Sequence, residues 1–235
     1  MNIQCVWEHN GADSLLYCVD FVGAYTRGSS REEAVRKMPS EIAAYLHWFG
    51  EPVPASYEIE ITQEKASELQ ICDADSDVLF DSERKPLTSE EYASLKALAL
   101  KSAEDFLVLY QAVPDKSTTN LPARRTFYGE IPRTADEMYL HTKNVNEYYF
   151  TEIGVVADNS GTILECRTRG FEALEQMPGF LKNPVTDGSY GEEWSLRKLM
   201  RRFVWHDRIH ARAMYRMATA VFGRDQIPDV FCFHS

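Results

Sequence analysis

Two histidines near the C-terminus have a spacing that suits metal binding. His206 and His210 are four positions apart in a segment with helical periodicity. Residues at this spacing lie one above the other on a helix, with Cβ atoms about 5–6 Å apart. From there, two imidazoles can reach one ion at about 2.0–2.1 Å. Burying an imidazole without a partner costs about 1–3 kcal/mol, so two of them in an apolar seam need an explanation. The other members of that seam are Leu196, Leu199, Phe203, Ala213 and Met217.

A third histidine precedes this pair in the chain. His141 shares a helical stripe with Glu137, Val145 and Tyr148, and the stripe is predicted to face inward. Across a helical core, His141 would then face the later pair. Three neutral histidines leave a tetrahedral ion with an open position, which is typical of catalytic sites. The same pattern also fits histidines that bind no metal and are hydrogen-bonded to core neighbours.

Other groups near these histidines have weaker claims to a role. Glu137 could orient a ligand, but it is expected mainly to cap the start of its helix. Asp207 is expected to point away from the seam into solvent, and Tyr148 to line a pocket or fill core. His234 would have to fold back to join the site. The sequence identifies no catalytic residue.

The chain that must position these residues is long enough for two domains. It has 235 residues, against about 100–150 for a usual single domain. We predict an α+β protein, with a small α/β domain and linker over residues 1–85 and a helical domain over residues 86–235.

The first domain shows alternating strand signals and one helix signal. Asn10-Gly11 predicts a hairpin turn between two strands, because both residues accept positive φ. A third strand is expected over 24–27 and a fourth over 57–61. Between them, Ser30 and Glu33 form a capping-box pattern that begins a helix ending near Gly50.

The second domain is predicted to be an antiparallel four-helix bundle. Capping-box patterns begin its first two helices at Thr88 and Thr134. The predicted helices cover about 88–113, 134–153 and 162–177, and a last one from Glu192 or Trp194 to 222.

The formal charge of −11 argues against nucleic acid and anionic membranes as partners. Lys198, Arg201 and Arg202 are interpreted as a solvated helix face. No segment approaches the roughly 18 apolar residues of a membrane span. The five cysteines are widely spread and read as free thiols, so we expect a cytoplasmic protein.

Residues 194–210, from Trp194 to His210, resemble the last-helix signature of the DinB/YfiT-like metalloenzyme superfamily. Residues 138–148 are similar to the segment that carries that family's first histidine. The resemblance covers about residues 87–222 and implies a divalent-ion site of His141, His206 and His210. Zn, Ni and Fe suit three histidines equally. Characterised relatives include transferases and isomerases that use bacillithiol, mycothiol or glutathione.

Residues 17–35, followed by Ala44-Tyr-Leu, resemble the core of HicB antitoxins. In that core, a strand pair leads into a helix that begins with a capping box. This sequence has Val22 where the family usually has proline, and no attached DNA-binding segment is visible. The resemblance therefore implies oligomerisation or partner contact rather than DNA binding.

Two functions remain open at this point, beside a third possibility, a redundant stress protein whose histidines bind nothing. The first is a metal-dependent enzyme, a thiol transferase or a hydrolase, acting on a small electrophilic molecule with a divalent metal ion and a low-molecular-weight thiol. The alternative is a non-enzymatic regulator, in which the HicB-like module binds a protein and the bundle is structural or senses metal. A homodimer is consistent with either function.

Overall fold

The computed structural model describes residues 1–126 and 129–234. The chain divides into two units. The first contains residues 1–84 together with the C-terminal residues from Phe231 to His234, and the second contains Lys85–Val230.

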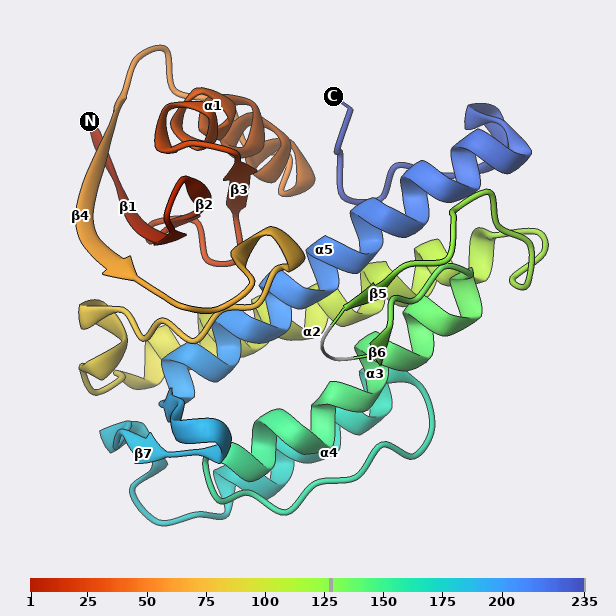
Figure 1. Ribbon diagram of the computed structural model, residues 1–235. Coiled ribbons are helices and arrows are strands. Elements are labelled where there is room, and N and C mark those ends of the chain that lie inside the picture. The colour runs from red at the N-terminus through yellow and green to blue at the C-terminus, as the bar shows by residue number, and fades with distance from the viewer. Residues whose placement is uncertain (127–128, 235) are drawn as a thin grey trace. The chain divides into compact units, whose positions relative to one another are not determined.

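The first unit is built on a four-stranded mixed sheet (Figure 1). Its strands are β1 (Asn2–Asn10), β2 (Asp13–Cys18), β3 (Tyr25–Gly28) and β4 (Glu58–Ala66). The order across the sheet is β3-β2-β1-β4. β1 is antiparallel to β2 and parallel to β4, so the chain crosses from β3 to the far edge through a helix. The expected strands and helix of this unit are confirmed.

The predicted hairpin forms, with its turn one residue later than expected. Asn10 pairs with Asp13, which leaves Gly11 and Ala12 as the two turn residues. Gly11 has φ +58°, a conformation that glycine adopts without a Cβ penalty. Asn10 therefore belongs to the strand.

The helix of the first unit is α1 (Arg31–Trp48), which packs against β2 and β3. The Ser30 side chain accepts a hydrogen bond from the Glu33 N–H, as its capping role requires. The Glu33 carboxylate accepts from the Ser29 N–H, one residue before the usual capping box. Pro39 lies within the helix.

The segment after β4 contributes to a buried polar network with residues of β1 and β2. It contains two short 3₁₀ turns, η1 (Ile71–Asp73) and η2 (Asp81–Arg84). The Tyr17 hydroxyl donates to Ser76 Oγ over 2.6 Å, and Ser76 Oγ donates to the Glu8 carboxylate over 2.5 Å. The Asp77 N–H donates to the other Glu8 oxygen over 3.2 Å. Glu8 has no exposed surface, and burial raises the pKa of its carboxyl to about 7.

This pKa predicts how the stability of the protein depends on pH. The folded-state pKa lies above the unfolded value of about 4.3, so the contribution of Glu8 is complete below about pH 4 and is lost as the pH rises through about 7. Glu8→Gln removes the titration. We expect the free energy of unfolding of this variant, relative to the wild type, to rise by about 2–3 kcal/mol between about pH 5 and 8.5. Urea titrations of both proteins at the two pH values measure the difference. A constant difference would contradict the prediction.

The second unit contains four α-helices in its described residues. They are α2 (Ser89–Ala112), α3 (Ala135–Glu152), α4 (Ile163–Glu175) and α5 (Leu196–Phe222). Both α2 and α3 pack against α4 and against α5. Short strand pairs and 3₁₀ turns lie between them: β5 (Arg125–Thr126), β6 (Gly129–Glu130), η3 (Phe180–Lys182), β7 (Thr186–Asp187), η4 (Ser189–Gly191) and β8 (Glu193–Trp194). A further 3₁₀ turn, η5 (Arg224–Gln226), follows α5. An α+β protein with a mainly helical C-terminal region is therefore confirmed.

Side-chain caps fix the helix starts in this unit. The expected capping boxes at Thr88 and Thr134 are both present, and the sequence reading missed a further one at Thr162. The last helix begins later than predicted, because Ser195 caps it and Trp194 belongs to β8. Each cap satisfies backbone N–H groups that have no partner within the helix.

The interpretation of Lys198, Arg201 and Arg202 as a solvated face was wrong. Their exposed fractions are 0%, 2% and 9%. Lys198 Nζ lies 2.9 Å from the Glu192 carboxylate and 5.1 Å from the centre of the Trp194 ring. Ion pairs with Glu192 and nearby aromatic faces stabilise Lys198 and Arg202 where water is excluded.

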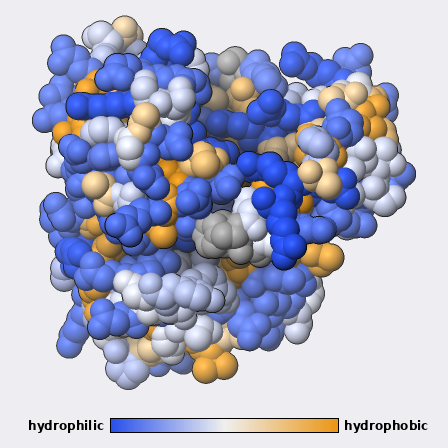
Figure 2. Space-filling view, in the orientation of Figure 1, coloured by the Kyte–Doolittle hydropathy of each residue, from blue (hydrophilic) through white to orange (hydrophobic). Residues whose placement is uncertain are grey.

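Within the described residues, no helix is long and apolar enough to cross a membrane. Hydrophilic residues dominate the face shown in Figure 2, with hydrophobic residues scattered between them.

Candidate metal centre

The structure brings together the three histidines that the sequence singled out. His206 and His210 lie one helical turn apart on α5, and His141 lies on α3, which packs against α5. The ring centroids are 4.5 to 5.1 Å apart. One ligand atom from each ring can be chosen so that all three lie within 4.8 Å of one another. We call these residues the histidine cluster. In the described part of the chain, no other group of three potential ligands is arranged in this way.

The closest approach in the histidine cluster has the separation expected of two ligands on one ion. His141 Nε2 and His206 Nε2 are 3.2 Å apart. Two nitrogens bound at about 2.0–2.1 Å with a tetrahedral angle are about 3.3 Å apart. The same distance also suits a hydrogen bond between two neutral imidazoles. The third ring offers a nitrogen within 4.8 Å of the other two ligand atoms.

The histidine cluster lies at the border of the core and not inside it. His206 is 8% exposed, His210 is half-buried and His141 is exposed. Of the four residues predicted to face inward, Glu137 and His141 are exposed, whereas Val145 and Tyr148 are half-buried. The buried residues of α3 are Ala135, Met138, Tyr139, Thr142, Asn146, Tyr149, Phe150 and Glu152. His141 lies beside this buried face, so the cluster is closed on the His206 side and open to solvent on its own side.

Desolvation favours the neutral form of two of the three histidines. Desolvation lowers the pKa of His206 well below its usual value, and the neighbouring His210 and His141 lower it further. Desolvation also lowers the pKa of His141. Neutral imidazoles have a free ring nitrogen that can bind an ion, whereas protonated ones do not.

An aromatic ring lies near His206 on its buried side. The Tyr149 ring lies 6.1 Å from the His206 ring and 5.4 Å from that of Phe203. The buried Nδ1 atom of His206 has no hydrogen-bond partner in the described part of the chain. Metal-bound histidines usually donate their second N–H to a carboxylate, carbonyl or water. This support for the ring is missing among the described side chains.

Asp207 is fully buried, so the expectation that it faces solvent was wrong. Its two carboxylate oxygens accept from Arg167 Nη1 over 2.5 Å and from Nη2 over 3.0 Å. Arg167, on α4, is also fully buried, and its guanidinium lies 4.1 Å from the centre of the Phe203 ring. Successive helical residues are about 100° apart, so Asp207 leaves α5 in another direction from His206. The side of α5 that carries Asp207 is therefore also buried by other parts of the chain.

The sequence reading missed Arg167. It lies between Cys166 and Gly170, which are both buried, on the same helix. A cation within the buried face of an amphipathic helix indicates a buried anionic partner, and this signal was available in the sequence.

The remaining candidates do not join the cluster. Glu137 caps α3, accepting from the backbone N–H groups of Arg133 and Thr134, and these bonds lower the pKa of its carboxyl. Tyr148 is half-buried and packs edge-on against Trp194, as a core residue would. His234 is not part of the group of potential ligands.

Comparisons of the chain with protein-family models, with curated proteins and with solved structures found no match. The chemistry of the histidine cluster is therefore the main indication of function.

Proposed function

We propose that His141, His206 and His210 bind one divalent ion, Zn, Ni or Fe, and form the metal centre of an enzyme. The observation that carries the proposal is the 3.2 Å separation between the Nε2 atoms of the buried His206 and the exposed His141. Three neutral histidines are a common ligand set for a catalytic ion with an open position. In this proposal the four helices form an antiparallel bundle of the DinB/YfiT-like kind.

The chain's own residues define the access to this centre. His206 holds the ion from the core side, while the exposed His141 leaves the opposite side open to incoming molecules. A bound divalent ion supplies Lewis acidity, which lowers the pKa of a coordinated water or thiol. The low pKa of His206 keeps that ring neutral at neutral pH, so protons do not compete for its nitrogen.

The proposed substrates are a small electrophile and a low-molecular-weight thiol such as bacillithiol, mycothiol or glutathione. In the reaction that the resemblance suggests, the thiol loses its proton and its sulfur forms a bond to an electrophilic carbon, which releases a halide or opens an epoxide ring. Hydrolysis is the variant with water as nucleophile. The negative charge of the protein gives no reason to expect nucleic acid as substrate. A homodimer is compatible with the exposed position of the cluster.

Activity measurements with the reconstituted protein test the enzymatic part of the proposal. Each thiol is incubated with an aryl halide or an epoxide, and its consumption is followed with a chromogenic thiol reagent. We expect the metal-loaded wild type to accelerate consumption of at least one thiol, and His210→Ala to return the rate to the uncatalysed value. An unchanged rate in this variant would place any activity outside the histidine cluster.

A non-enzymatic regulator is the second candidate, and the first unit favours it. Its resemblance to HicB antitoxins and its exposed sheet edge both suit contact with another protein. If the protein binds metal but neither consumes a thiol nor hydrolyses a substrate, this second function is favoured.

A further inference from the structure

One edge of β4 in the first unit pairs with no strand among the described residues. β4 is the last strand in the sheet order, and Figure 1 shows it at one side of the sheet. The Glu58 N–H donates to the Met1 carbonyl, toward β1. Backbone groups alternate along a strand, so those of Ile59 and Ile61 point away from β1. Uncovered edges of this kind pair readily with another strand.

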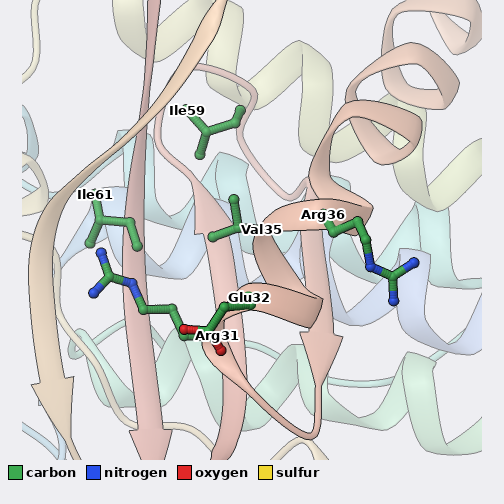
Figure 3. Close-up of a pocket in the computed structure, with 6 residues that line it drawn as sticks. All are labelled: Arg31, Glu32, Val35, Arg36, Ile59 and Ile61. Atoms are coloured by element: carbon green, nitrogen blue, oxygen red, sulfur yellow. The ribbon is translucent and has the colours of Figure 1, made fainter.

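A pocket of about 390 Å³ adjoins this edge. Arg31, Glu32, Val35 and Arg36 of α1 line one side, and Ile59 and Ile61 of β4 line the other. Figure 3 shows Val35 between the helix and the two isoleucines, with Arg31 extending alongside Ile61. In this view Arg36 extends on the other side of the helix. The apolar side chains therefore form the floor of a groove between a helix and a free strand edge.

The two faces of β4 differ in chemistry. Ile59 and Ile61 face the groove, where the Arg31 guanidinium also lies 5.1 Å from the centre of the Trp7 ring. Glu58 and Glu60 alternate with the isoleucines and so lie on the opposite face of the sheet. An added strand would meet apolar side chains and an arginine on one face, and two carboxylates on the other.

We propose that the groove between β4 and α1 binds an extended segment of another protein, in which apolar residues alternate with lysine or arginine. The segment adds a strand to the β4 edge through the backbone groups of Ile59 and Ile61. Its apolar side chains enter the groove, and its basic side chains reach Glu58 and Glu60. Arg31 opposes the reverse arrangement, in which basic side chains would face the groove.

The charges favour this partner over a second copy of the chain. Pairing of β4 with its own copy would bring four carboxylates, Glu58 and Glu60 from each chain, onto one face of a joined sheet. Like charges on neighbouring strands are destabilising. The carboxylates therefore oppose self-association and attract a basic strand.

Selection from a random nonapeptide library displayed on phage tests the proposal with the full-length protein. The library is panned in parallel on the wild type and on Ile59→Pro. Proline removes the outward N–H of Ile59 and leaves the Glu58 bond to β1 intact, so circular dichroism should match the wild type. We expect enriched sequences that alternate apolar with Lys or Arg, and at least about tenfold weaker binding of the synthetic peptides to Ile59→Pro.

A charge-reversed variant checks the register. Glu58→Lys/Glu60→Lys should enrich alternating sequences with Asp or Glu in place of the basic residues. The proposal is overturned if the wild type enriches no alternating sequence, if the selected peptides bind Ile59→Pro equally well, or if the charge preference does not reverse. A wild-type dimer that Ile59→Pro dissociates in light-scattering measurements would also overturn it, because a second copy would then occupy the edge.

Discussion

The wild-type protein, purified and reconstituted with Zn, Ni or Fe, is expected to retain about one equivalent of metal. His206→Ala/His210→Ala is expected to retain almost none, because His141 alone supplies a single nitrogen. Elemental analysis after desalting measures the stoichiometry. One equivalent is expected because the described residues contain one group of three suitable ligands. Because the pKa values of His206 and His141 are lowered, both rings should be neutral at neutral pH, and the metal should stay bound there.

Thermal unfolding gives a second measure of the same site. An ion that binds only the folded state stabilises it by about 2.7 kcal/mol at a free concentration of one hundred times its Kd. For a chain of this length, we expect the Tm to rise by about 5–10 °C. His47→Ala is the matched control, because His47 is an exposed histidine outside the cluster. It should keep both the metal and the Tm shift. If the control and the double variant hold equal amounts of metal, the histidine cluster is not the metal site.

The second large effect is expected at the buried ion pair of Arg167 and Asp207, next to the histidine cluster in the chain. Arg167→Met leaves the Asp207 carboxylate without its partner in a fully buried position. Removing one member of such a pair costs about 3–5 kcal/mol, since the remaining charge is desolvated and uncompensated. We therefore expect a decrease of this size in the free energy of unfolding, measured by urea titration at neutral pH.

Two further variants separate charge from packing. Arg167→Met/Asp207→Leu removes both charges and should recover most of the lost stability, because apolar replacement of a whole buried pair is often neutral. Arg169→Met is the matched control on the same helix. Its pair with Asp158 is exposed, and surface ion pairs contribute little. Additive costs in the double variant would mean that Arg167 and Asp207 do not depend on each other.

The local sequence signals determined most of the helix starts and the hairpin. Thr88 and Thr134 begin their helices as their capping boxes predict, because a cap depends on residues within one turn of each other. The hairpin at Gly11 likewise depends on the conformational freedom of one residue. The spacing of His206 and His210 placed two imidazoles on one side of α5 for the same local reason.

Tertiary packing decided the features that depend on several helices together. The sequence singled out His141, but only the packing of α3 against α5 places its Nε2 within 3.2 Å of His206 and leaves its outer side in solvent. The periodicity of α5 predicted one buried face. Other chain segments cover most of its circumference, which is why Lys198 and Asp207 are buried. The periodicity of apolar residues shows which side of a helix is most apolar. How many neighbouring segments surround that helix depends on the fold as a whole.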